Sequence, residues 1–123
     1  MGSKVSPLTA EEILSWGKQT HEIKISFAGK TWKVKVRPVT VADTGWIRQQ
    51  ARARANAEGR HSFEEWTGIY TIHRALVEPK LSVEEIEQLP FGVQVKLSFK
   101  INEISGLTAD LTNLLMGTQE ETF

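Results

Sequence analysis

The stretch that decides the fold is "ISFAGKTWKVKVR", from Ile25 to Arg37. Its Gly-Lys-Thr tripeptide follows an apolar, strand-like run, as it does at the end of a phosphate-binding loop. Such a loop begins with a glycine five residues before the Gly-Lys-Thr and opens directly into a helix. Here Lys24 stands in the place of that first glycine, and the residues after Thr31 alternate like a strand. We therefore exclude a nucleotide-binding loop.

The same stretch instead predicts an antiparallel β-hairpin over residues 22–37. A two-residue turn at Gly29-Lys30, with glycine first, suits a type II′ geometry. This turn would pair six apolar side chains across one face: Phe27 with Trp32, Ile25 with Val34, and Ile23 with Val36. The opposite face is polar throughout. Because strand side chains alternate between faces, the hairpin needs a second layer to cover its apolar side.

Composition restricts the function classes. The 123 residues are enough for one domain that buries about two-thirds of its unfolded surface. Basic and acidic residues balance at 15 each, so no overall charge favours nucleic acid or an anionic membrane. The chain has no cysteine, which excludes disulfides and fits a reducing cytosol. We expect neither a membrane span nor a signal peptide, because no apolar run approaches ~20 residues.

Helix starts are marked by a hydroxyl residue followed three positions later by an acidic one, the capping box. The four boxes are Thr9 with Glu12, Thr40 with Asp43, Ser62 with Glu65, and Ser82 with Glu85. They predict helices at about 9–16, from 40 to Gly59, from 62 to Pro79, and briefly before Pro90. Apolar and aromatic residues recur at helical spacing in the third helix: Phe63, Trp66, Ile69, Tyr70, His73, Leu76 and Val77.

The segment after Pro90 can be a strand or a helix. Six apolar residues alternate strictly, as in a strand: Phe91, Val93, Val95, Leu97, Phe99 and Ile101. The spacing of Ile101, Ile104 and Leu107 instead fits a helix, with Gly106 just past its end. Periodicity alone favours a strand over the first half. Residues 108–123 form a polar tail, which we expect to be partly flexible and which carries one apolar patch.

The residues do not predict an enzyme, a metal site or a cofactor site. The three histidines, His21, His61 and His73, lack the spacing for shared metal ligation. Paired glutamates fall mostly in the first turns of predicted helices, where the helix dipole accounts for them. A cluster of Arg48, Arg52, Arg54 and Arg60 could contact nucleic acid, since Arg48 and Arg52 share a helix face. The helix lacks interleaved aromatic residues, so a solvent-facing helix is the favoured interpretation.

Apolar residues that the predicted core does not use are candidates for partner contacts. Trp32, Trp46 and Trp66 can be assigned to the core between hairpin and helices. Exposed apolar groups elsewhere indicate an interaction surface. The partner-contact candidates are Trp16, Leu111, Leu114, Leu115 and Met116.

The colinear order of weak motifs along nearly the whole chain resembles the small tail assembly chaperones of long-tailed bacteriophages and prophages. In that family a tryptophan-containing strand runs into an arginine and a threonine-marked helix start, and a passage "EP-L-s-eE---LP-G" leads to a helix ending in "sGL". The matching positions here are Trp32, Arg37, Thr40, Glu78-Pro79, Leu81, Glu84-Glu85, Leu89-Pro90, Gly92 and Ser105-Gly106-Leu107.

This resemblance implies a non-catalytic role in the host bacterial cytoplasm. Such chaperones bind the long, helix-rich tape-measure protein, keep it soluble and recruit tail-tube subunits, and they are absent from the mature virion. The resemblance also implies a helix, not a strand, over Phe91–Ser105. We therefore expect a single small α+β domain, one hairpin packed on several helices with a helical part over 40–107. Whether the chain also binds itself is left open.

Two other function classes stay open. One is a structural tail component of the tail completion type, which would be built for protein contacts in the same way. The other is a nucleic-acid-binding phage regulatory protein that uses the Arg48 and Arg52 helix. Phosphate binding falls steeply with ionic strength, so salt dependence separates this second class from the others.

Charge substitutions Leu114→Glu and Leu115→Glu are expected to weaken partner binding, because each puts a carboxylate into an apolar contact. Thermal unfolding of the free domain should stay nearly unchanged. Co-purification of the partner and a thermal melt measure the two effects. If the substitutions unfold the domain, the tail belongs to the core and these residues leave the partner surface.

Overall fold

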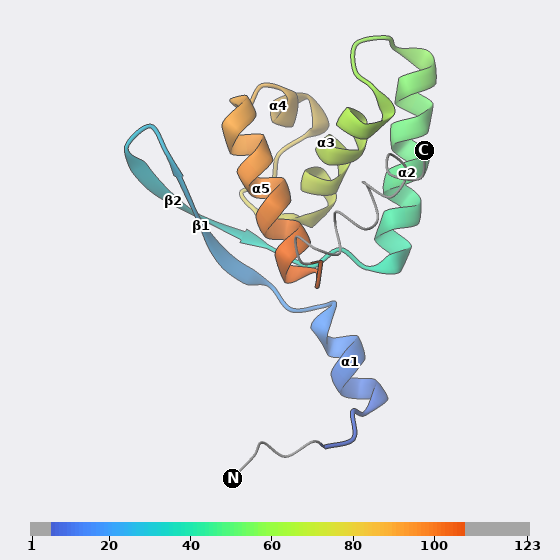
Figure 1. The fold of residues 1–123 in the computed structure, drawn as a ribbon, viewed down its shortest axis with the longest axis vertical. Helices are drawn as coiled ribbons and strands as arrows, with labels where there is room; N and C mark the ends of the chain where they lie inside the picture. The colour runs from blue at the N-terminus through green and yellow to red at the C-terminus, as the bar shows by residue number, and fades with distance from the viewer. Residues whose placement is uncertain (1–5, 108–123) are drawn as a thin grey trace, which may run out of the picture.

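The chain forms a three-stranded antiparallel sheet and five helices within residues 6–107, the part that the structure, a computed structural model, describes (Figure 1). The fold is α+β, as predicted. The elements in chain order are α1 (Ala10–Trp16), β1 (His21–Phe27), β2 (Lys30–Val36), α2 (Val41–Ala57), α3 (Phe63–Ala75), β3 (Leu76–Glu78), α4 (Val83–Glu87) and α5 (Phe91–Ile104).

All four predicted capping boxes form. In α1, α2, α3 and α4 the hydroxyl of the N-cap residue accepts from the third helical N–H, and the acidic side chain accepts from the N-cap backbone. The helix α5 begins after Pro90 without a side-chain cap. It ends before Gly106, whose φ of +94° is the left-handed conformation expected just past a helix.

The hairpin forms, but the predicted pairing was wrong by two residues. The turn is Ala28-Gly29, with φ of 55° and 78°, as a type I′ turn requires. Ile25 therefore lies opposite Trp32 and Ile23 opposite Val34. A left-handed alanine costs about 1 kcal/mol, so the sequence alone disfavours this turn. Since a shift of two keeps every side chain on its face, the apolar face is the predicted one.

A third strand replaces the end of the predicted third helix. The prediction of helix at Leu76 and Val77 was wrong, because α3 ends at Ala75 and the chain pairs with β2. Leu76 lies opposite Val36, and the Arg37 N–H donates to the Ala75 carbonyl at 2.9 Å. Helical spacing cannot reveal this change, because a neighbouring strand with free backbone groups outweighs a weak local propensity.

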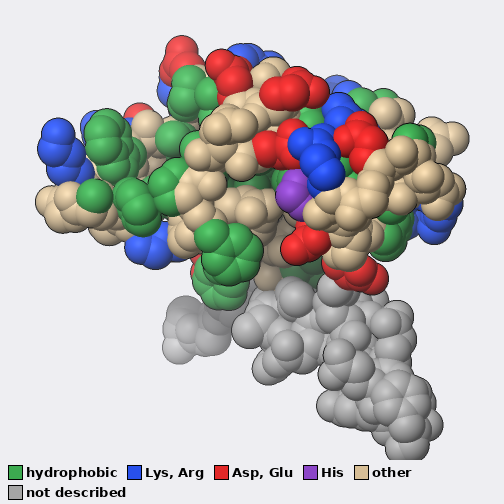
Figure 2. Space-filling model, turned by 90° about the horizontal axis from the view of Figure 1, so that it is seen from above, with side chains coloured by type: hydrophobic (Ala, Val, Ile, Leu, Met, Phe, Trp, Pro, Cys, Tyr) green, Lys and Arg blue, Asp and Glu red, His purple; other side chains and the backbone are tan. Residues whose placement is uncertain are grey.

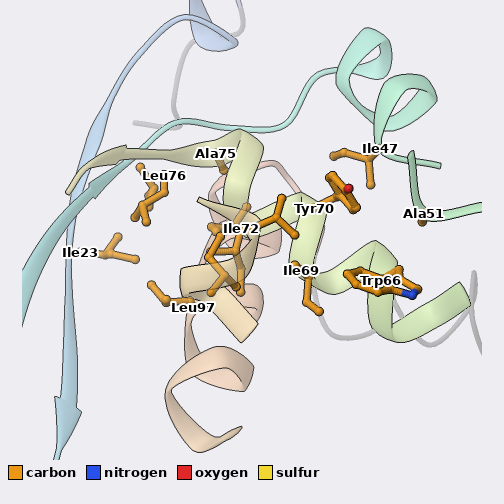
Figure 3. Close-up of a cluster of buried hydrophobic side chains, with 14 of the residues drawn as sticks. Ile23, Ile47, Ala51, Trp66, Ile69, Tyr70, Ile72, Ala75, Leu76 and Leu97 are labelled. Carbon is orange, nitrogen blue, oxygen red and sulfur yellow. The ribbon is translucent and has the colours of Figure 1, made fainter. Parts of the chain in front are cut away.

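The helix α3 lies at the centre of the core. On one side its Trp66 and Tyr70 face Ile47 and Ala51 of α2 (Figure 3). On the other side Ile72, together with Leu76 of β3, faces the sheet and α5 through Ile23 and Leu97 (Figure 3). Trp66 and Ile72 are fully buried. The helix α3 therefore lies between α2 on one side and the sheet on the other.

A buried carboxylate joins the sheet to the helices. Asp43, in the first turn of α2, has a side chain that is only 6% exposed. It accepts from the Arg37 guanidinium at 2.8 and 3.2 Å and from Arg74 Nε at 2.8 Å. The Thr40 N–H and hydroxyl each donate to it at 2.9 Å. These bonds, with that of Arg37 foremost, hold the pKa of Asp43 well below its usual range.

The substitution Asp43→Asn keeps the shape of this side chain and removes its charge. We expect it to lower the free energy of unfolding by about 2 to 3 kcal/mol, because two arginines lose their shared counter-charge while keeping some access to water. Urea denaturation measures the loss. Glu85→Gln is the matched control, since Glu85 holds the same helix position in α4 without buried arginines. It should cost about 0.5 kcal/mol.

The same variant should also change the dependence of stability on pH. The pKa of Asp43 is lower in the folded protein than in the unfolded chain, where it is about 3.9. Above this unfolded pKa the carboxylate contributes its full stabilisation, and the stabilisation is lost as the pH falls toward the folded pKa. The wild type should therefore lose more stability below about pH 4 than Asp43→Asn does. Equal losses in the two proteins would contradict the charged role of Asp43.

Candidate functional site

The helix α5 explains the alternating pattern that suggests a strand. Residues two apart on a helix point in nearly opposite directions, since each residue turns by about 100°. Leu97 and Ile101 are buried, whereas Phe91, Val95 and Phe99 are 77, 49 and 57% exposed. The helix implied by the resemblance is confirmed, and the strand favoured by periodicity was wrong. Strict alternation here marks a helix that is apolar on two sides.

An apolar hollow separates the outer part of the hairpin from the first half of α5. We call it the hairpin groove; its volume is about 290 Å³, and its lining residues include Phe27, Trp32, Val34, Leu81, Pro90 and Val93. Figure 1 shows the hairpin turn reaching well beyond α5. The remaining helices that the structure describes do not cover that outer part, so the groove opens to water.

The assignment of Trp32 to the core was wrong. Trp32 is 51% exposed, and Phe27 on the facing strand is 37% exposed. The Trp32 side chain lies on the apolar face, as predicted, but at the outer end of the hairpin beside the groove. Trp66 is fully buried and Trp46 packs partly buried against the core. The groove therefore carries a large aromatic side chain that folding leaves half exposed.

Other apolar groups are exposed on α1. This helix projects from the base of the hairpin and has no buried residue (Figure 1). Leu14 is 67% and Trp16 is 54% exposed. The exposure of Trp16 fits its selection as a residue that the core does not use. The other partner-contact candidates, Leu111, Leu114, Leu115 and Met116, lie outside the described residues.

The polar residues singled out in the sequence form local pairs. His61 Nε2 lies 2.9 Å from Glu87, and His73 Nδ1 lies 3.0 Å from the Leu81 carbonyl. Within residues 6–107 no three metal-ligating side chains come together. Arg54 is paired with Glu58 and Glu84, and Arg60 with Glu58 and Glu87.

The two arginines proposed for nucleic acid differ in their contacts. The Arg52 guanidinium lies over the ring of Phe63, 5.2 Å from its centroid. Arg48 makes no ion pair with the described residues. Arg54 and Arg60 are paired to carboxylates, so Arg48 and Arg52 are the two members of the predicted cluster that make no ion pair with the described residues. None of the described helices is long and apolar enough to cross a membrane.

Comparisons of the chain with protein-family models, with curated proteins and with solved structures returned no match. The candidate site therefore rests on the described geometry. Two sides of α5 carry it: the hairpin groove on one side, and the exposed stripe of Phe91, Val95 and Phe99 on the other.

Sequence reasoning missed both features. The stripe was visible as an alternating pattern in a segment that ends with a helix-stopping glycine, a combination that indicates a helix with two apolar faces. The exposure of Trp32 had no local signal, because it depends on how far α5 reaches along the hairpin.

Two substitutions to alanine distinguish the contributions of the two faces of α5 to stability, because alanine does not lower helix propensity. Leu97→Ala should cost about 2 to 5 kcal/mol of unfolding free energy, since it leaves a cavity in the core. Phe99→Ala, two residues away, should cost under about 1 kcal/mol, because that ring is largely in water. Chemical denaturation measures both. Similar large costs at the two positions would place them on the same buried face.

Proposed function

We propose that this chain is a tail assembly chaperone of a long-tailed phage or prophage, a non-catalytic protein that binds the tape-measure protein and helps recruit tail-tube subunits. The observation that carries the proposal is the hairpin groove, an apolar hollow bordered by the half-exposed Trp32. It is supported by the colinear motifs of the family along the sequence.

The groove suits the partner that the resemblance implies. A long helical protein exposes apolar faces until tube subunits surround it, and an amphipathic helix binds by laying its apolar face into such a groove. A few residues, with tryptophan among the most frequent, contribute most of the binding energy at protein interfaces once the partner covers them. Trp32 and Phe27 therefore serve as the anchors on the hairpin side, and Val93 and Pro90 as the opposite wall.

Two family positions also have a clear structural task in this chain. Arg37 and Thr40 both donate to Asp43, so the "arginine then threonine" motif fixes the angle between the hairpin and α2. A motif that orients the hairpin also orients the groove. This gives a physical reason for that order of residues along the chain.

The test is co-expression with the tape-measure protein of the same phage. The wild-type chain should keep the tape-measure protein soluble and elute with it, together with tail-tube subunits, and should be missing from purified virions. The double variant Phe27→Ala with Trp32→Ala should retain the fold and bind roughly tenfold or more weakly. Val41→Ala is the control, because Val41 is 88% exposed on α2, away from the groove.

The other outcomes identify the alternatives. Recovery of nuclease-sensitive material that dissociates at raised salt would favour the nucleic-acid class and its Arg48 and Arg52 surface. Finding the chain inside purified virions would make it a structural tail component. Failure of the soluble wild-type protein to bind the tape-measure protein would overturn the chaperone proposal.

A further inference from the structure

A second hollow lies on the other side of α5, between that helix and the beginning of α3. We call it the α3–α5 cleft; its volume is about 420 Å³. The exposed side chains of Phe91 and Val95 form its apolar wall, and Gly68 with Ile69 of α3 lines its floor. Its third side carries Glu64 and Glu65 in the first turn of α3. The cleft is therefore apolar on one side and acidic on the other.

The acidic side carries more carboxylates than the described basic groups beside it can neutralise. Glu64 makes no hydrogen bond or ion pair with the described residues. Glu65 accepts the Ser62 N–H at 2.8 Å in its capping box and lies 3.9 Å from His61 Nδ1. Glu87, deeper in the cleft, lies 3.1 Å from Arg60 and 2.9 Å from His61. Since Arg60 is shared with Glu58, the rim keeps an excess of negative charge.

The main group of acidic side chains and the main group of apolar side chains lie in different parts of one face of the molecule. Viewed from the top of Figure 1, hydrophobic side chains gather toward the hairpin end, with basic side chains beside them. Farther along this face, acidic side chains with a basic one among them surround a histidine (Figure 2). The α5 stripe of Phe91, Val95 and Phe99 runs alongside the cleft and extends its apolar wall. These residues are spaced one turn apart, so the stripe is about 12 Å long, enough for two turns of a partner helix.

We propose that the α3–α5 cleft binds an amphipathic helix whose apolar face is flanked by lysine or arginine. The apolar face covers Phe91, Val95 and Phe99. A basic side chain lays its aliphatic stem along Val95 and brings its charged end to Glu64 and Glu65. An acidic helix of the same hydrophobicity is disfavoured, because like charges would meet at the rim. This inference rests on the proposed function and specifies a second kind of tape-measure segment, one that binds the α3–α5 cleft and is distinct from the helix in the hairpin groove.

Two synthetic peptides of about 18 residues, or five helical turns, test this inference. They share one leucine stripe and differ only in flanking residues, all lysine in one and all glutamate in the other. Fluorescence anisotropy with the full chain at low salt should show the lysine peptide binding about tenfold more tightly. Raised salt should reduce the difference, since exposed charges are screened.

Variants locate the binding. Glu64→Lys should remove the preference for the lysine peptide, whereas Glu11→Lys should keep it. Glu11 is the matched control because it occupies the same first-turn position in α1 and gives the same change in net charge. Val95→Ala should weaken both peptides. Amide resonances of Gly68 and Ser98 should shift on binding.

Equal affinity for the two peptides, or an unchanged preference in Glu64→Lys, would overturn the inference. So would loss of binding in Trp32→Ala with no effect of Val95→Ala, because the peptide would then occupy the hairpin groove. These outcomes are distinct from a failure of the proposed function, which appears as loss of co-purification between the wild-type chain and the tape-measure protein.

Discussion

The structure depends on one buried carboxylate. Asp43 is the only buried charged side chain among residues 6–107, and it draws donors from three elements: Arg37 after β2, Thr40 at the start of α2, and Arg74 in the last turn of α3. Burying this charge is favourable only because every donor is in place. The backbone N–H of Arg37 also donates to the Ala75 carbonyl, so the same residue fixes the point where α3 ends and β3 begins. The angle between the sheet and the helices follows from it.

The Asp43 network holds the base of the hairpin, where β2 ends, and leaves the turn end of the hairpin exposed. The short β3 pairs with β2 at Lys35 and Val36, beside the Asp43 network. Farther out, the described residues that face the apolar side come from α5 and from the loops before and after α4, with Lys96 donating to the Ser26 carbonyl. Beyond that contact Phe27 is still 37% exposed and Trp32 51% exposed. The hairpin groove is thus a consequence of holding two long strands by their base.

Local signals predicted the fold better than the site. The four capping boxes and the hairpin faces depend on residues within a few positions of one another, and each was recognised correctly. The register was wrong because Ala28 accepts a left-handed conformation that alanine disfavours. The third strand was missed because Leu76 is ordered by Val36, far away in sequence. The uncovered Trp32 depends on the reach of α5, which no local pattern encodes.

The alternation along α5 links folding to function. Leu97 and Ile101, with Val93 and Ile104 partly buried beside them, give the helix its face for the core, whereas Phe91, Val95 and Phe99 are largely exposed on the opposite side. Exposed aromatic residues at one-turn spacing raise the risk of aggregation, and polar residues there would leave the core unchanged. Their presence is best explained by a contact outside the described fold. Because this stripe borders the acidic cleft while Val93 borders the hairpin groove, one helix would supply an apolar wall to both surfaces.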